Sequence, residues 1–357
     1  MATRRSRRRS SPPRPSASVG KPRGVLFETE PKECAGPAPG PRPLYDRFRA
    51  NRTGSRRRSA GVAQLCRAWS RQGPAVKTSV VFFPFDLFGS AGAGGGAELL
   101  AEAVEEMLAD NRRERMPTRA RVYAGKVRVR QFAFDTLAAY HDWRKQGRQA
   151  VRRAWRNHDF LLWVTGNHLG VLPVYDELAA TAHDTLVVQL DAHLDVYNLS
   201  DCTAELSHGN FLRHCAGPLP TIINLGTREL LLRPDHVARY YQEVFPAADL
   251  ALDPAPALER VRKAAAAARR VFLDIDCDVL DPAYFPAVTH PLPFGLSPHL
   301  LLRFVDAVWS DRLAGLALSE FDPGRDQRDQ SLATLLWLLE YLLLKRYEGR
   351  KKRGREP

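Results

Sequence analysis

Short apolar runs alternate with amphipathic helical patterns from residue 78 onward, and this alternation constrains the fold more than any other feature of the sequence. The runs are rich in β-branched and aromatic residues, which predicts strands at Ser79–Phe85, Arg121–Phe134, Phe160–Val164, Thr185–Leu190, Thr221–Leu225, Arg270–Ile275 and Leu313–Leu318. Helical patterns fall between them, at Ala97–Arg115, Leu137–Trp155, Pro298–Trp309 and Gln330–Tyr347. This order favours an α/β fold of three layers, in which helices cover both faces of a mainly parallel sheet.

Polar residues follow directly after three of the expected strands. Asn167 and His168 follow the first of these strands, Asp191 and His193 follow the second, and the third cluster runs from Asp274 to Asp278. The strand centres are continuous apolar runs, as expected for strands that are buried on both faces. Ligands of open parallel sheets bind beyond the carboxyl ends of the strands, so the three clusters predict one functional site at that edge.

Carboxylates and imidazoles in these clusters have the spacing of metal ligands. Asp191, His193 and Asp195 are two residues apart, so an extended segment would place them on one face. So many carboxylates in one place must take up protons or bind cations, and two dications would balance four carboxylates. The predicted ligands are His168, Asp191, His193, Asp195, Asp276 and Asp278. Spacing alone leaves Asp274 with Asp276 open as an alternative pair.

The ligand set is rich in oxygen, with two imidazoles and no thiolate. This composition disfavours a structural zinc site of the cysteine type and favours two Mn²⁺ ions, with Fe, Co, Ni or Zn as alternatives. Paired metal ions activate water for attack on an electrophile at neutral pH. The pattern therefore predicts a hydrolase with two metal ions.

The motifs resemble those of the ureohydrolase family, which includes arginase, agmatinase and formiminoglutamase. Residues 191–195 match the family's DAHxD motif, and residues 276–282 match its DxDxxDP motif. Residues 166–168 resemble the family's Gly-Asp-His, with Asn167 in place of the Asp. Residues 207–209 resemble the family's His-Gly pair that precedes a helix. The segment 315–323 resembles the last strand, and the glycine-rich segment 89–96 resembles an N-terminal loop. The resemblance spans about residues 80–345 and implies an arginase-like fold.

The resemblance also implies which residues hold each metal ion. One ion would be bound by His168, Asp191, Asp195 and Asp276. The other would be bound by His193, Asp191, Asp276 and Asp278. Alignment on Asp281-Pro282 selects Asp276 with Asp278 and leaves Asp274 a supporting role. The amide oxygen of Asn167 is expected to accept a hydrogen bond from the His168 imidazole, as the family's Asp would.

For the reaction, the resemblance implies hydrolysis of a linear C–N bond, other than a peptide bond, in a guanidino or formimino compound. Asp195 would help to move a proton, and His208 would act as a proton shuttle because histidine titrates near neutral pH. Glu320 would bind the guanidinium edge through charge-assisted hydrogen bonds. His290, next to a proline, is a further candidate for the wall of the substrate pocket.

Two departures from the arginases argue against free arginine as the substrate. Tyr197 stands where arginases have an Asn that recognises the amino acid end of arginine. The residues after Arg228 match the arginase acidic segment poorly, and Arg228 could bind a substrate carboxylate or a core acid. An agmatinase-like or guanidino-acid hydrolase is therefore favoured over an arginase, and a formimino substrate stays open.

Two other functions compete with this one. The first is an amidohydrolase on the related deacetylase fold, which the lack of a His-His pair and the two DxD-type carboxylates disfavour. The second is a binding protein that keeps the fold without catalysis, for which Asn167 is the only support.

The charge is divided unevenly along the chain. Residues 1–77 hold 19 Lys and Arg against 4 Asp and Glu, whereas residues 78–344 carry a net charge of −7 and residues 345–357 a net charge of +5. We therefore expect a disordered basic extension at 1–77, a metallohydrolase domain at 78–345 and a basic tail at 346–357. The acidic domain suits a small cationic substrate. The extension is interpreted as a solubilising segment, with contact to nucleic acid as the alternative.

The remaining features concern location and assembly. The five cysteines include no close pair, which favours free thiols in a reducing compartment and a cytoplasmic location. No apolar run is long enough for a membrane span. The family resemblance implies a homo-oligomer, either a trimer or a hexamer.

Overall fold

The computed structural model describes residues 77–89, 91–116, 118–197 and 205–353. Almost all of the expected basic extension at 1–77 lies outside the described residues, as does the end of the expected basic tail beyond residue 353. None of the helices in the described ranges has the length and hydropathy that crossing a membrane requires.

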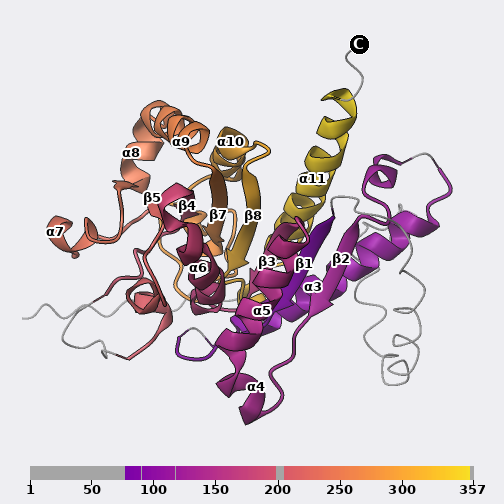
Figure 1. Cartoon of the computed structure of the whole chain (residues 1–357), viewed down its shortest axis with the longest axis horizontal. Coiled ribbons are helices and arrows are strands. Elements are labelled where there is room, and N and C mark those ends of the chain that lie inside the picture. The colour runs from indigo at the N-terminus through magenta and orange to yellow at the C-terminus, as the bar shows by residue number, and fades with distance from the viewer. Residues whose placement is uncertain (1–76, 90, 117, 198–204, 354–357) are drawn as a thin grey trace, which may run out of the picture. The chain divides into compact units, whose positions relative to one another are not determined.

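One parallel sheet forms the centre of the described chain (Figure 1). All its strands pair in parallel, in the order β2-β1-β3-β8-β7-β4-β5-β6. The strands are β1 Thr78–Phe83, β2 Val127–Gln131, β3 Phe160–Thr165, β4 Thr185–Leu190, β5 Thr221–Leu225, β6 Glu243–Phe245, β7 Arg270–Asp276 and β8 Leu313–Ser319. The three-layer α/β fold predicted from the sequence is therefore confirmed.

Helices follow the strands as the alternating pattern requires. The α-helices are α3 Ala93–Arg113, α4 Leu137–His141, α5 Trp143–Arg156, α6 Leu172–Leu178, α7 Pro234–Val237, α8 Ala247–Leu252, α9 Ala255–Ala267, α10 Pro298–Val308 and α11 Gln330–Arg353. Short 3₁₀ helices are η2 Arg119–Val122, η3 His168–Val171, η4 Ala179–Asp184, η5 His208–His214, η6 Cys277–Val279 and η7 Pro323–Arg325. Three of these short helices, η3, η5 and η6, begin at or next to predicted site residues.

Helix α10 shows how the sequence sets one of these elements. The hydroxyl of Ser297 accepts a hydrogen bond from the Leu300 N–H, and proline occupies the first helical position. Apolar residues at 301, 304, 305 and 308 are buried, which is the spacing of one helix face. That face packs on β7.

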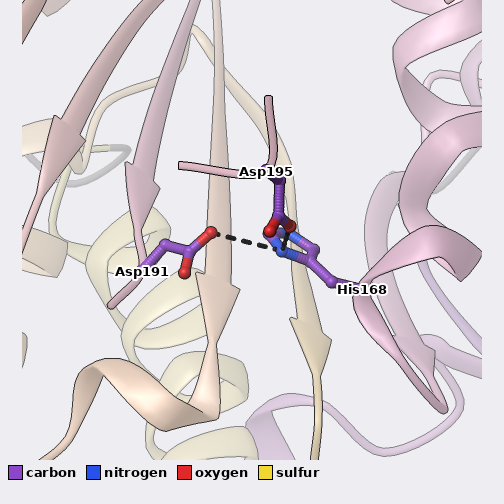
Figure 2. Close-up of side chains that lie close together, drawn as sticks. All are labelled: His168, Asp191 and Asp195. Carbon is purple, nitrogen blue, oxygen red and sulfur yellow. Dashed lines mark ion pairs between the residues drawn. The ribbon is translucent and has the colours of Figure 1, made fainter. Parts of the chain in front are cut away.

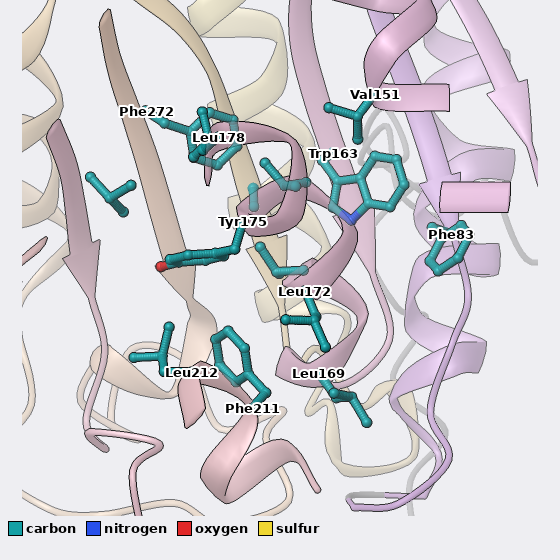
Figure 3. Packing of buried hydrophobic residues seen from close by; sticks show 14 of the residues in the cluster. Phe83, Val151, Trp163, Leu169, Leu172, Tyr175, Leu178, Phe211, Leu212 and Phe272 are labelled. Carbon is teal, nitrogen blue, oxygen red and sulfur yellow. The ribbon is translucent and has the colours of Figure 1, made fainter. Parts of the chain in front are cut away.

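The core on one face of the sheet lies under α5 and α6 (Figure 3). Trp163 of β3 is fully buried there against Phe83, and its indole N–H donates to the carbonyl of Gly170 at 3.0 Å. Tyr175 of α6 and Phe272 of β7 extend the same cluster. Helices α3, α9 and α10 contact strands of the same sheet but contribute no residue to this cluster. The sheet is therefore covered on both faces, and its polar groups emerge at the strand ends.

Several boundaries differ from those predicted. The strand expected at 121–134 is confined to β2 because residues up to 122 form η2 and Gly125 turns the chain with a φ of 71°. The helix expected at 137–155 breaks at Asp142 into α4 and α5. The edge strand β6 was not predicted, since three half-buried residues show too little alternation. Helix α11 continues beyond Tyr347 to Arg353.

The four central strands carry the predicted site residues at their carboxyl ends. In the sheet these strands are neighbours, in the order β3-β8-β7-β4. His168 follows β3, Glu320 follows β8, Asp276 ends β7 and Asp191 follows β4. The topology therefore brings residues that are far apart in sequence to one edge of the sheet, as expected for this class of fold.

Candidate metal centre

The segment from 191 to 195 is a tight loop at the end of β4, not the extended segment that the two-residue spacing predicted. The Asp191 N–H donates to the Leu225 carbonyl of β5 at 3.2 Å, and the chain then turns away from the sheet. Asp195 has a φ of 48°, a left-handed conformation that is uncommon outside glycine. The Asp195 carboxylate thereby faces His168 (Figure 2).

His168 is where several of these carboxylates converge. Its ring is buried, and the two carboxylates of the 191–195 loop reach it from the β4 side (Figure 2). Its Nδ1 lies 2.8 Å from Oδ2 of Asp195, 3.2 Å from Oδ2 of Asp276 and 3.3 Å from Oδ2 of Asp191. Three strands thus contribute to one cluster around this nitrogen.

The other ring nitrogen of His168 is bound by Asp274, not by Asn167. Nε2 lies 3.1 Å from Oδ2 of Asp274, and the Tyr175 hydroxyl donates to the same oxygen at 2.7 Å. The amide of Asn167 instead donates to the Leu87 carbonyl at 3.0 Å. The expectation that Asn167 accepts from the imidazole was therefore wrong, because its side chain is used to hold the loop after β1. The supporting position expected for Asp274 is the one that the structure shows.

A second group of possible ligand atoms lies around His193. Its Nδ1 is 2.7 Å from Oδ2 of Asp278, whose other oxygen accepts from the Ala192 N–H at 3.1 Å. Asp191, His193 and Asp278 present ligand atoms within 4.8 Å of one another, and so do His168, Asp191 and Asp195. The two groups share Asp191.

The charges of this cluster are poorly compensated by the protein alone. Burial, followed by the Asp195 carboxylate, raises the pKa of Asp191 to about 7. Burial and then Asp278 raise the pKa of Asp276 well above its ordinary value. Burial would lower the pKa of His168, but the surrounding carboxylates outweigh it and raise that pKa well above the usual range. Burial and crowding therefore disfavour the charged forms of these carboxylates, and bound cations relieve this electrostatic cost.

Two buried atoms support the fit of the donor set to metal ions. Nδ1 of His168 and Oδ2 of Asp191 have no hydrogen bond of acceptable geometry to any described residue. Carboxylate oxygens and imidazole nitrogens that face one another in this way are the donors that divalent transition metals bind. The residues therefore fit the pair of metal ions that the family resemblance implies.

A cavity of about 400 Å³ opens above the cluster. Its wall includes His168, His193, Asp195, Asp276, Asp278 and Glu320 from the strand ends, together with Phe88, Gly89, Tyr197, Ser207, His208, Gly209, Asn210, Val288, Thr289 and His290. Among the described residues of the wall, four are acidic and none is Lys or Arg. The cavity is therefore suited to a small cation.

Glu320 and His208 lie together at this wall. Glu320 has a φ of 63°, and its Oε1 accepts from the His168 N–H at 2.8 Å and lies 3.3 Å from Nδ1 of His208. His208 starts η5, which Ser207 and Asn210 cap reciprocally. The rings of His208 and His290 have centroids 6.0 Å apart. The structure thus brings these three predicted residues, Glu320, His208 and His290, to the cavity.

Comparison with protein families decides the assignment. A model of the arginase family matches residues 76–344, which is most of the chain. The chain belongs to the arginase family. The resemblance to ureohydrolases drawn from the motifs is thereby confirmed.

Curated relatives of this arginase-family chain match it at low identity. N(1)-aminopropylagmatine ureohydrolase of Thermus thermophilus is 26% identical over 198 residues, which cover 53% of this chain and 64% of that protein. Agmatinase of Neisseria meningitidis is 27% identical over 189 residues, which cover 52% and 59% of the two chains. The matched region thus spans less than two thirds of these relatives.

Solved structures support the fold. A hypothetical agmatinase from Burkholderia thailandensis superposes with a TM-score of 0.63 at 21% identity, covering 79% of this chain and 89% of that chain. Arginase from Bacillus subtilis superposes with a TM-score of 0.60 at 20% identity, covering 75% and 98% of the two chains. The arginase-like fold predicted for this chain is confirmed.

Two residues predicted to bind substrate have different positions in this arginase-family chain. Tyr197 is part of the cavity wall, and its hydroxyl donates to Oε2 of Glu229 at 2.5 Å. Arg228 is not among the residues of the wall, and its guanidinium donates to the carbonyls of Asp278 and Val279. Arg228 was expected to bind a substrate carboxylate or a core acid. The structure corrects this, because the guanidinium binds the backbone of the loop that carries Asp278.

Some supporting residues had no recognisable pattern in the sequence. Tyr175 occurs in the apolar pattern of α6, where an aromatic residue predicts packing and not a hydrogen bond to Asp274. Gly89 lines the cavity, and a Cβ there would lie 2.5 Å from the His208 ring. The glycine-rich segment that resembles the family's N-terminal loop was the available signal for Gly89.

Proposed function

We propose that this arginase-family protein hydrolyses a linear C–N bond in a small guanidino or formimino compound with the help of two metal ions. The observation that carries the proposal is the pair of ligand groups that share the buried Asp191 and whose other members, His168, Asp195, His193 and Asp278, line the cavity. The alternative of a binding protein without catalysis depended on Asn167. That support is weaker because Asp274 occupies the position beside the His168 imidazole.

We assign the metal ligands as the motifs imply. His168, Asp191, Asp195 and Asp276 would hold one ion, and His193, Asp191, Asp276 and Asp278 the other. When bound, two dications supply a Lewis acid and an activated water at neutral pH. Mn²⁺ is the proposed metal, since hard oxygen ligands predominate over two imidazoles. A trimeric or hexameric assembly and a cytoplasmic location remain predictions.

The protein's own side chains would orient the substrate and move protons. Glu320 is 5% exposed and faces the cavity, so its carboxylate can form charge-assisted hydrogen bonds with a guanidinium. Asp195 would accept a proton from the attacking water and deliver it to the leaving amine. His208, whose Nδ1 is 3.3 Å from Glu320, would pass a proton to or from the open side of the cavity.

The cavity wall favours an agmatine-like amine within this substrate class. A guanidino acid needs a cation for its carboxylate, and the described part of the wall contains no Lys or Arg. Arg228, the candidate for that task, points to the carbonyls of Asp278 and Val279. Tyr197 and His290 would instead contact the chain of the substrate.

A substrate panel tests this proposal. The full chain would be loaded with Mn²⁺ and incubated with guanidino amines, guanidino acids and formimino compounds, while urea, ammonia and formamide release are measured. We expect turnover of a guanidino amine, and loss of that turnover with one ion fewer in His193→Ala. His183→Ala, a change at an exposed histidine, is the matched control and should keep full activity. Full activity of His193→Ala would refute the scheme.

A further inference from the structure

The segment from Asn224 to Tyr241, here called the β5–β6 arm, carries none of the proposed metal ligands but holds the loop that does. Four backbone carbonyls, of residues 192, 193, 194 and 196 in and directly after that loop, each accept a hydrogen bond from the arm. Ala192 O accepts from the Arg228 N–H at 2.8 Å, His193 O from Nδ2 of Asn224 at 3.3 Å, Leu194 O from the Tyr241 hydroxyl at 2.5 Å, and Val196 O from Nε2 of His236 at 2.7 Å.

Among these donors, Tyr241 binds the backbone next to the proposed ligand Asp195. Its side chain is 3% exposed, and its hydroxyl lies 2.8 Å from Oε1 of Gln189, a side chain of β4 below the loop. It binds the carbonyl of the residue immediately before Asp195. Asp195 has a φ of 48°, which an L side chain adopts only when its surroundings hold it there. The phenol of Tyr241 is well placed to provide that constraint.

Arg228 connects the same arm to the second ligand loop. Its backbone N–H donates to Ala192 O, while its guanidinium donates to the carbonyls of Asp278 and Val279. One residue therefore binds the backbone of two of the three segments that carry proposed ligands, those after β4 and β7. The side chain is half-buried, so these bonds are partly protected from competition by water.

We propose that the β5–β6 arm is the positioning frame of the metal centre. In this frame Tyr241 fixes the backbone that orients Asp195, and Arg228 joins the 191–195 loop to the loop at Asp278 and Val279. This inference rests on the proposed two-metal function. The hydrogen-bonding partners behind metal ligands orient those ligands, and losing one such partner commonly weakens metal binding by about 10–100-fold. Tyr241 and Arg228 are thus positioning residues, since neither is assigned a contact with substrate or metal.

The test is Mn²⁺ binding to the metal-free full chain, measured by titration calorimetry. Tyr241→Phe removes one hydroxyl and keeps the ring, and we expect about 10–100-fold weaker binding of one of the two ions. Tyr240→Phe is the matched control, because it deletes a hydroxyl at the next position and keeps the ring that contacts His236. The control should bind both ions as the wild type does. Chemical unfolding of the metal-free proteins, measured in parallel, separates positioning from simple stability.

The outcomes distinguish this inference from the proposed function. If the wild type binds two ions and Tyr241→Phe binds them within about twofold while its metal-free stability falls, Tyr241 only packs and the inference is wrong. Should Tyr241→Phe fail to fold, His236→Leu decides, because His236 is half-buried and its loss removes the bond to Val196. Weakened binding there supports the frame, and unchanged binding overturns it. A wild type that binds no Mn²⁺ refutes the two-metal proposal itself.

Discussion

Replacing Asp274 with Asn tests which side chain orients His168. Asp274 is fully buried, and one of its oxygens both lies 3.1 Å from Nε2 of His168 and accepts from the Tyr175 hydroxyl at 2.7 Å. An amide has one oxygen and one NH₂ group, and it carries no charge to strengthen either bond. Asp274→Asn therefore weakens the acceptor that fixes the imidazole while it changes the volume of the side chain very little.

The expected magnitude follows from the burial of Asp274. Loss of a hydrogen-bonding partner behind a metal ligand weakens metal affinity by about 10–100-fold, which corresponds to about 1.4–2.7 kcal/mol. Water cannot reach this position to replace the lost acceptor, because Asp274 is 0% exposed. We therefore expect Asp274→Asn to lie towards the upper end of that range.

The assay is Mn²⁺ titration of the metal-free protein, with Asn167→Ala as the comparison. The Asn167 side chain donates only to the Leu87 carbonyl among the described residues, so the loss of that side chain should cost about 0.5–1.5 kcal/mol of folding free energy. Its effect on metal affinity should be much smaller than that of Asp274→Asn. Equal or reversed effects of the two variants on Mn²⁺ affinity would refute the assignment of Asp274 as the partner of His168.

Three further predictions concern stability. Arg144→Met leaves the buried Asp176 carboxylate without its bidentate partner and should cost about 3–5 kcal/mol in urea unfolding; a loss below about 1 kcal/mol would contradict this. Burial raises the pKa of Glu177, but two arginines of α5 outweigh it and lower that pKa. Its ion pairs should therefore stabilise the fold above pH about 4.3 and be lost as the pH falls through the lowered pKa, so that the Tm values of Glu177→Gln and wild type converge in acid. Gly96→Ala places a Cβ 1.8 Å from the Phe321 carbonyl, and its Tm should fall by several degrees because this backbone cannot give way; an unchanged Tm would show that it can.

The sheet could be predicted because its central strands are continuous apolar runs that end in polar residues. This pattern predicts His168, Asp191 and Asp276 at one edge of the sheet, and the structure has all three there. The pattern was weak at the outermost strand of the sheet, where β6 has three half-buried residues. Side-chain alternation over such a short stretch carries too little information to define a strand.

Backbone conformation and long-range hydrogen bonds could not be predicted from spacing. The i, i+2, i+4 rule assumed an extended backbone for 191–195, whereas Asp195 lies in the left-handed region. The hydrogen-bonding partner of the His168 imidazole could not be predicted from the adjacent Asn167, because that partner is Asp274, 106 residues away in sequence. Arg228 looked available for a substrate because nothing local competes for it, but tertiary contacts to residues 278 and 279 occupy its guanidinium.

The central claim is that two metal ions share the buried Asp191 beneath the cavity wall. The most direct measurement is a crystal structure of the Mn²⁺-loaded full chain, with anomalous scattering recorded at the manganese edge. The account predicts two peaks about 3.5–4 Å apart, one beside His168 and the other beside His193, with Asp191 between them. A single peak, or peaks away from these residues, would contradict it.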